Sequence, residues 1–167
     1  MAKLFVYKDH ENSPFGKYIQ LRWKEALGLP ECPYLYRWTF IFFGYSIRIH
    51  HWLRSDDNRF FHDHSCDLIS MILKGWYYNV VPKDPNNPDV NECIKHKGRA
   101  FRPWRAKAED KHYLEIPKGG AWTLLLQGKQ YHKWGFWVKN KKTKKFVKWR
   151  PLRYFSKYGI IQTEDYQ

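Results

Sequence analysis

Short runs of β-branched and aromatic residues, separated by turn residues, dominate the chain from residue 34 onward. The first two runs, YLYRWTFIFF and YSIRIHHWL, flank Gly44, which is the pattern of two strands joined by a tight turn. Further strands are expected in DLISMILKGWYYNVV, around Arg99–Pro103, in HYLEI, AWTLLLQG and KWGFWVKN, and near KFVKW. The polar segment Pro82–Pro88 is expected to be a loop, because strand-like sequence resumes after it. This spacing predicts a mainly β domain, either a closed barrel or a sandwich.

One segment near the N-terminus has a different pattern. Ser13 and Pro14 supply an N-cap and a proline for the first helical turn, and Gly28 supplies a stop. These signals predict a helix over residues 14–28. We therefore expect an N-terminal extension, residues 1–33, whose helix packs on the barrel, and a barrel domain over residues 34–167.

The composition indicates the cellular compartment. No window approaches the roughly 20 uninterrupted apolar residues that a membrane-spanning helix requires, and the first residues lack the apolar stretch of a secretory signal. The three cysteines, Cys32, Cys66 and Cys93, are an odd number without paired spacing, which is typical of free thiols in a reducing compartment. A cytoplasmic protein that does not bind membranes is expected.

A histidine pair is the most informative motif. Alternate residues of a strand share a face, so His62 and His64 would lie side by side while Asp63 faces away. His112 is the best third donor, with Glu115 as a further oxygen donor. Three histidines with open positions suit one divalent transition metal such as Fe, Zn, Ni or Mn. From spacing alone, partly exposed surface histidines are an equally good interpretation.

The histidine pair resembles the first motif of the cupin superfamily, G-x5-H-x-H-x(3,4)-E-x6-G. His62 and His64 supply its histidines and Gly75 its closing glycine. The acidic ligand of the family would fall at position 68, which is Leu68 here. Asp67 is adjacent and would serve as a ligand only if the chain bulges after His64. Three-histidine sites without the carboxylate are known among cupins, so the resemblance still implies metal binding.

The second cupin motif is matched loosely by Gly98, Pro103 and His112. The runs HDHSCDLISMILKGWYYN, GRAFRPWRAKAEDKHYLEI and AWTLLLQGKQYHKWGFW, within residues 34–139, are similar to small cupin-like proteins of bacteriophages. The resemblance implies a double-stranded β-helix, or jelly-roll, barrel. It also implies a phage setting in the host cytoplasm, and a homodimer formed through the outer sheets.

The charge balance favours anionic partners. The chain has 30 Lys and Arg against 16 Asp and Glu, a net charge of +14, which suits a nucleotide, a nucleic acid or a small anionic substrate. One cationic group precedes the first histidines on a predicted strand, and a second precedes His112 near the expected barrel mouth. If these side chains face the interior, they would bind a substrate anion; the candidates are Arg48, His50, Arg54, Arg102 and Arg105.

A second basic region lies near the C-terminus. Seven of the twelve residues in Lys139–Arg150 are basic and none is acidic. Such a run attracts phosphates, and interspersed aromatic rings stack on bases. A solvated hairpin tip is the alternative interpretation. The candidates for nucleic-acid binding are Lys141, Lys142, Lys144, Lys145 and Trp149.

Two functional hypotheses follow. The first is a metal-dependent cupin enzyme that acts on a small anionic or nucleotide-like substrate by oxygenase, isomerase or hydrolase chemistry. The second is a non-catalytic barrel that binds nucleotides or nucleic acid, in the setting of a phage protein that counters host defence. The absence of a nucleophile elbow and of a phosphate-binding glycine loop from the sequence argues against serine hydrolase and P-loop chemistry.

Overall fold

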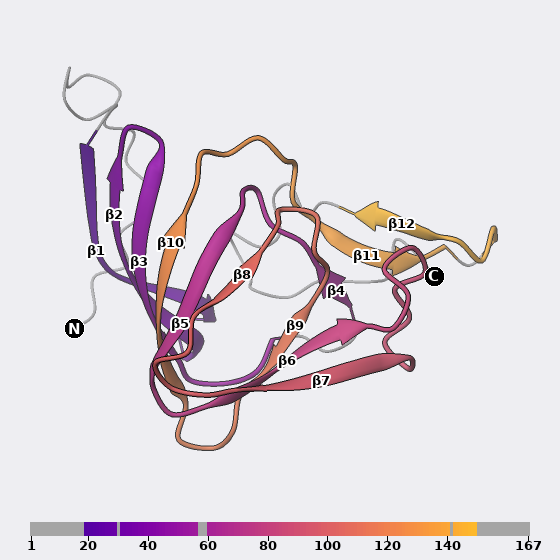
Figure 1. Ribbon diagram of the computed structural model, residues 1–167, viewed down its shortest axis with the longest axis horizontal. Helices are drawn as coiled ribbons and strands as arrows, with labels where there is room; N and C mark the ends of the chain where they lie inside the picture. The colour runs from indigo at the N-terminus through magenta and orange to yellow at the C-terminus, as the bar shows by residue number, and fades with distance from the viewer. Residues whose placement is uncertain (1–18, 30, 57–59, 141, 150–167) are drawn as a thin grey trace.

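The computed structural model describes residues 19–29, 31–56, 60–140 and 142–149, and these residues form strands and connections without any helix (Figure 1). The prediction of a mainly β chain is therefore confirmed. No helix long and apolar enough to cross a membrane occurs in these ranges. In chain order the strands are β1 (Ile19–Leu29), β2 (Cys32–Phe42), β3 (Tyr45–Trp52), β4 (Phe61–His62), β5 (Leu68–Lys74), β6 (Tyr77–Pro82), β7 (Cys93–Gly98), β8 (Trp104–Ala106), β9 (Tyr113–Glu115), β10 (Ala121–Gln127), β11 (Phe136–Lys139) and β12 (Phe146–Trp149).

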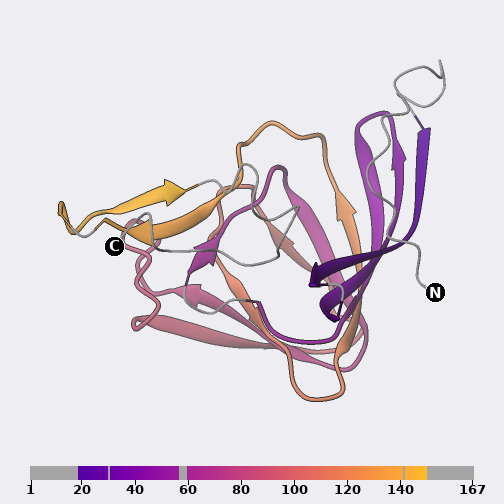
Figure 2. The same cartoon turned by 180° about the vertical axis from the view of Figure 1, so that it is seen from behind.

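The strands form three antiparallel sheets. A six-stranded sheet has the order β1-β2-β3-β10-β5-β8, and two three-stranded sheets have the orders β7-β6-β9 and β12-β11-β4. In Figure 1 the strands β1, β2 and β3 stand at the left, β6 and β7 cross the lower part, and the β11–β12 hairpin extends at the right. Figure 2 shows the same arrangement from behind. Because β10 lies between β3 and β5, segments far apart in sequence are neighbours in the large sheet.

The inner face of the large sheet supplies one wall of the core. Along β3, β5 and β10, alternate side chains are buried and the intervening ones are more exposed, which is the period-2 pattern of a sheet with one covered face. The largest buried cluster joins this face to the β7-β6-β9 sheet. Its members are Leu35, Trp52, Ile72 and Ala121 from the large sheet and Tyr77 and Leu114 from β6 and β9.

The outer face of the large sheet is apolar and open within the described part of the chain. Leu21, Phe40, Ile47, Leu126 and Ile69 follow one register row across five strands. The first four of these side chains are between 39 and 67% exposed. Exposed apolar surface of this extent marks interaction sites in proteins, and the homodimer expected from the sequence stays a prediction.

The N-terminal helix predicted over residues 14–28 is wrong for its described part, residues 19–28, which belong to β1; residues 14–18 lie outside the described residues. β1 pairs with β2, and a bulge between Arg22 and Glu25 gives Lys24 a positive φ of 49°. The helix signals act only locally, whereas β2 offers a row of backbone hydrogen bonds. Gly28, expected as a helix stop, has φ 107° beside a second bulge. The division at residues 33 and 34 stays a prediction.

The strand expected around Arg99–Pro103 is also wrong. The chain turns there, between β7 and β8, with only an isolated bridge from Ala100 to Ile72. Phe101 has φ 60°, and Pro103 has no N–H for a ladder hydrogen bond. By contrast, the tight turn expected at Gly44 is confirmed, because Phe43 and Gly44 both have positive φ between β2 and β3.

Gly120 provides a test of how closely β3 and β10 approach each other. A Cβ atom at Gly120, where φ is 74°, would lie 2.3 Å from the carbonyl oxygen of Trp52. We predict that Gly120→Ala lowers the free energy of unfolding by about 3 kcal/mol, from the clash and the left-handed backbone together. Chemical denaturation measures this change.

Gly119 in the same turn is the matched control. Its φ is also positive, at 99°, but an added Cβ would meet no atom within 4 Å. Gly119→Ala should therefore cost only the backbone strain, about 1 kcal/mol. Equal losses in the two variants would contradict the close packing at Gly120.

Candidate metal centre

Three histidines from two chain segments meet at one end of a pocket. His62 ends β4, His64 follows it by two residues, and His112 directly precedes β9. The ring centroids lie 4.9 Å apart for His62 and His112, 4.8 Å for His64 and His112, and 5.6 Å for His62 and His64. One ring nitrogen from each histidine lies within 4.8 Å of the other two. The structure thus brings together the three histidines that the sequence singled out.

Backbone hydrogen bonds hold the segments that carry these rings. His62 N donates to His112 O at 3.0 Å, and His112 N donates to His62 O at 2.9 Å. His64 N donates to Ala108 O at 2.8 Å. The reciprocal pair is the narrow antiparallel bridge between the two chain segments. The rings are therefore placed by main-chain geometry rather than by flexible loops.

The imidazole nitrogens have the pattern of metal ligands. His112 Nδ1 lies 2.6 Å from Asn79 Oδ1, and because a carbonyl oxygen only accepts, Nδ1 carries the proton. This leaves His112 Nε2 as a lone-pair donor, and both this atom and His64 Nε2 are buried without a hydrogen-bond partner in the described part of the chain. Buried polar atoms without partners are uncommon and costly. A divalent transition metal fits this donor set, with Asn79 orienting one ligand.

Burial also keeps the rings in the form that binds metals. It lowers the pKa of His62 to about 4 and, together with the neighbouring His62, lowers that of His64 to about 3. The pKa of His112 is likewise depressed, first by burial and then by the other two rings. Neutral imidazole is the form that ligates metal ions. All three rings are accordingly neutral at physiological pH.

Asp63 faces away from the histidines and anchors their strand from behind. Its carboxylate accepts hydrogen bonds from Gly135 N at 2.7 Å and Trp137 Nε1 at 3.3 Å, and it pairs with Lys148 and His132. The side chain of Asp63 is fully buried. Burial alone would raise the pKa of Asp63, but the hydrogen bonds from Lys148, His132 and Gly135 outweigh it and lower the pKa. The HxH segment is thus tied to the β11–β12 hairpin.

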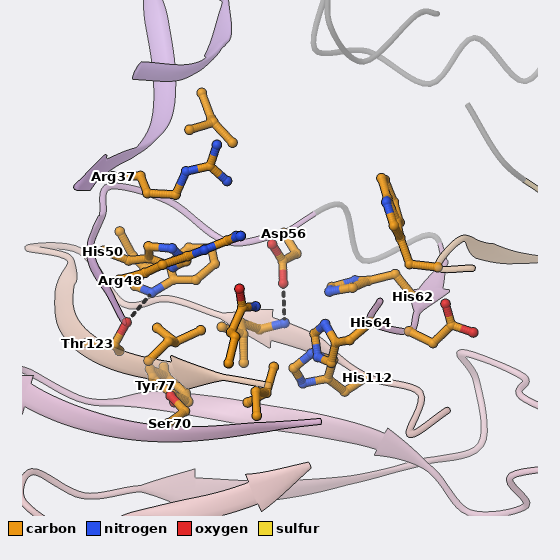
Figure 3. A pocket seen from close by; sticks show the side chains of 18 of the residues that line it. Arg37, Arg48, His50, Asp56, His62, His64, Ser70, Tyr77, His112 and Thr123 are labelled. Atoms are coloured by element: carbon orange, nitrogen blue, oxygen red, sulfur yellow. Dashed lines mark hydrogen bonds between the residues drawn. The ribbon is translucent and has the colours of Figure 1, made fainter. Parts of the chain in front are cut away.

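The histidines form one end of a pocket of about 300 Å³. Figure 3 shows His62, His64 and His112 at one end and Arg37, Arg48 and His50 at the other. The carboxylate of Asp56 lies between the two groups and accepts a hydrogen bond from Leu114 N at 2.8 Å. Apolar side chains complete the walls, among them Leu27, Trp52, Leu68, Leu125 and Trp134. A volume near 300 Å³ is at the small end of ligand pockets.

Two of the five cationic residues proposed for the substrate line this pocket, namely Arg48 and His50. The other three do not. Arg54 is exposed and donates to Cys32 O, Arg102 is exposed in the turn before β8, and Arg105 lies on the outer face, paired in register with Ile69. These placements correct the expectation for Arg54, Arg102 and Arg105, because strand parity cannot tell which residues remain inside once a strand ends.

The carboxylates proposed as oxygen ligands lie elsewhere. Asp67 is exposed and accepts hydrogen bonds from Ala108 N and Tyr131 Oη, so its carboxylate belongs to the β4–β5 connection and not to the three-histidine cluster. Glu115 pairs with Lys95 at 2.8 Å. The chain turns between His64 and β5, but the turn directs Asp67 outward. The expectation that Asp67 is a metal ligand is therefore corrected.

The basic run falls on the β11–β12 hairpin. Lys142, Lys144 and Lys145 are exposed near its turn, where Asn140 Oδ1 accepts from Lys142 N at 3.0 Å. Lys141 lies outside the described residues, and Trp149 is the last residue of β12. In Figure 1 this hairpin projects away from the large sheet.

The sequence interpretation missed three residues of the site: Arg37 and Asp56, which line the pocket, and Asn79, which is hydrogen-bonded to His112. Arg37 and Asn79 each interrupt an apolar strand, LYRWTF and YYNVV, and an isolated polar residue at an inward position is the signal that would have found them. Asp56 lies in the polar segment after β3 and carries no such signal. Its place in the pocket depends on the hydrogen bond that it accepts from Leu114 N of β9.

Removing the charge of Asp63 tests the anchor behind the histidines. We predict that Asp63→Asn lowers the free energy of unfolding at pH 7 by about 3 kcal/mol, because Lys148 would lose its buried partner. Because the folded-state pKa of Asp63 is lowered, its contribution is present above the unfolded pKa near 4 and is lost as the pH falls through the folded value. Denaturant unfolding between pH 7 and pH 2 follows both effects.

The control is Asp89→Asn, which removes the carboxylate of a more exposed ion pair with Lys139. Exposed pairs contribute little, so we expect a change of about 0.5 kcal/mol or less. A loss in Asp63→Asn no larger than this, or one independent of pH, would contradict the role assigned to Asp63.

Comparisons with known proteins give distant structural matches. No model of a protein family matches the sequence, and no curated protein matches it. Hydroxypropylphosphonic acid epoxidase from S. wedmorenis matches 63% of the chain at 10% identity with a TM-score of 0.47, and a mutant of oxalate decarboxylase from Bacillus subtilis matches 69% at 10% identity with a TM-score of 0.46. The chain spans 55% of the epoxidase and 28% of the decarboxylase.

Proposed function

We propose that the protein is a metal-dependent enzyme of the cupin type that acts on a small anionic or nucleotide-like substrate by oxygenation, isomerisation or hydrolysis. The observation that carries this proposal is the convergence of His62, His64 and His112 at one end of a pocket, where the Nε2 atoms of His64 and His112 are buried without partners among the described residues. A structural role alone does not explain unpaired ring nitrogens on the wall of a cavity.

Three protein ligands and an open side toward the pocket are the arrangement of catalytic rather than structural metal sites. His62, His64 and His112 would hold the metal, which supplies Lewis acidity to an oxygen atom when bound. Asn79 fixes the His112 ring through the 2.6 Å hydrogen bond. The apolar walls exclude water, which strengthens electrostatic interactions inside the pocket.

The remaining polar groups suit the binding and proton transfer that such a reaction needs. Arg48 and His50 lie opposite the histidines, where they would orient an anionic group of the substrate. Asp56 brings a carboxylate between the two ends and would accept a proton from the substrate. Together these residues place one end of a ligand near the three histidines and hold its other end against the large sheet.

Metal content is the first test. Protein purified without a histidine tag should contain about one Fe, Zn, Ni or Mn per chain, and a His62→Ala/His64→Ala double variant should lose it. Elemental analysis by mass spectrometry measures the ratio, and circular dichroism shows whether the variant stays folded.

His96→Ala is the control. His96 is exposed on β7, where it pairs in register with Asn79 of β6, and it is not part of the three-histidine cluster. It should retain the metal content of the unchanged protein. An unchanged chain without metal after reconstitution, or a folded double variant that retains it, would overturn the metal-dependent function.

The exposed lysines of the β11–β12 hairpin favour a second candidate, a non-catalytic barrel that binds nucleotides or nucleic acid. Lys142, Lys144 and Lys145 lie together at the hairpin turn, on a chain of net charge +14. A phage protein that counters host defence is the setting we infer for it from the sequence resemblance. The phage origin, the cytoplasmic location and the homodimer stay predictions.

Salt dependence separates the two candidates. If the hairpin binds single-stranded DNA, replacing Lys142, Lys144 and Lys145 at its turn by alanine should reduce the slope of log affinity against log salt by about 2. A matched triple variant, Lys74→Ala/Lys83→Ala/Lys118→Ala, removes the same charge from other exposed positions. Equal slopes in both variants would contradict a specific role of the hairpin. Fluorescence anisotropy at several salt concentrations gives the slopes.

A further inference from the structure

The pocket end opposite the three histidines is built from two arginines and a histidine on the inner face of the large sheet. Arg37 on β2 and His50 on β3 are direct partners in register, and Arg48 lies two residues before His50 on the same face. All three line the pocket (Figure 3). Directly opposed residues of an antiparallel pair have their Cβ atoms within about 5.5 Å. The three side chains thus form one cluster, which we call the cationic end.

The His50 ring at this end has no hydrogen-bond partner among the described residues. Its side chain is 7% exposed, and both ring nitrogens are buried. The ring packs edge-on against Trp52, with the centroids 5.3 Å apart. A neutral imidazole has one donor and one acceptor, and leaving both unpaired in the interior is unfavourable. A polar ligand that accepts one hydrogen bond would satisfy the donor.

Arg48 supplies a partly buried positive charge. Its Nε donates to Ser46 Oγ at 3.3 Å, and no carboxylate of the described residues forms an ion pair with it. Burial, and then the nearby charge of Arg37, lower the pKa of Arg48 to about 10, so the guanidinium stays charged at neutral pH. A charge removed from water requires a counter-charge or hydrogen bonds.

The nearby carboxylates do not neutralise Arg48. Glu25 is engaged by Arg37, whose Nε donates to it at 2.9 Å. Asp56 lies between the two ends of the pocket, where it accepts from Leu114 N. The cationic end therefore has one guanidinium and one imidazole directed at the cavity without an anion of the described chain opposite them.

The size of the cavity limits what can fill it. A volume of 300 Å³ is at the small end of the range of ligand pockets, which favours a compact ligand. A nucleotide is a much larger molecule and fits a pocket of this size less well. The apolar side walls, formed in part by Leu125 and Trp52, favour a short carbon skeleton between two polar ends.

We propose that the cationic end of Arg37, Arg48 and His50 binds the oxyanion of a small organic acid, whose other end reaches His62, His64 and His112. The inference rests on the proposed metal-dependent function and narrows its substrate to a compact acid instead of a nucleotide. Arg48 donates in a forked geometry to the oxyanion, and His50 donates one ring N–H. Carboxylate and phosphonate groups share this chemistry.

Isothermal titration of the full chain, as purified and again after chelation of metal, tests the proposal. The probes are malonate, its neutral isostere malonamide, methylphosphonate and AMP. Malonate and methylphosphonate should bind and malonamide should not, and the tighter of the two anions identifies the oxyanion class. AMP should bind at least about tenfold more weakly than malonate, because a pocket of this size favours a compact ligand.

Arg48→Gln should weaken the binding of malonate about tenfold or more, the loss expected for a charge-assisted hydrogen bond. Arg105→Gln is the matched control, because Arg105 is exposed on the outer face of the same sheet, and it should bind as the unchanged protein does. If Arg48→Gln does not fold, His50→Phe keeps a ring of similar shape and should weaken binding through the lost donor. Thermal unfolding monitors folding in each variant.

The proposal would be overturned if folded Arg48→Gln bound malonate as tightly as the unchanged protein does. It would also be overturned if malonamide bound as tightly as malonate. AMP binding that is as tight as malonate binding and depends on Arg48 would overturn it as well. Metal content distinguishes failure of this proposal from failure of the metal-dependent function, because Arg48→Gln should retain its metal whether or not it binds malonate. Conversely, the His62→Ala/His64→Ala variant should still bind malonate, although without the gain that metal provides.

Discussion

The buried carboxylate of Asp63 is the interaction on which the arrangement of the site depends. It accepts from Gly135 N and Trp137 Nε1 and pairs with Lys148, so it ties the segment between β4 and β5 to the β11–β12 hairpin. His62 and His64 flank it in sequence and face the opposite way. A buried charge is stable only where its partners hold it, so the same bonds that neutralise Asp63 also orient the HxH segment. The reciprocal backbone bonds between His62 and His112 then bring in the third ring.

The pocket combines two ends of different chemistry in one small cavity. At one end, three neutral imidazoles meet, and the Nε2 atoms of His64 and His112 are buried without partners among the described residues, which suits a cation. At the other, Arg48 and His50 suit an anion. The large sheet supplies the cationic end. The histidines come from the end of β4, from the connection that follows it and from the residue before β9, and Asn79 comes from β6. Because the two ends belong to different sheets, their spacing is set by the packing of the core between them.

Strand periodicity explains which sequence predictions succeeded. The runs from Tyr45 to Trp52 and from Ala121 to Gln127 form strands in which buried and more exposed side chains alternate. Strand periodicity also predicted that the side chains of His62 and Asp63 point to opposite faces. It failed for residues 19–28, where capping signals at Ser13 and Gly28 suggested a helix but pairing with β2 produced a strand. Local propensity is a weak determinant when a sheet edge offers a row of hydrogen bonds.

The sequence by itself determined the mainly β class, the positive charge and the three candidate histidines, because these follow from composition and from the period of a strand. Only the tertiary structure decided that Asp67 faces solvent and that Arg54, Arg102 and Arg105 lie outside the pocket. It also decided that Arg37 and Asp56 line the pocket and that Asn79 binds the His112 ring. The physical reason is that strand parity gives the direction of a side chain relative to its neighbours. The residues it meets depend on register and sheet packing between segments far apart in the chain.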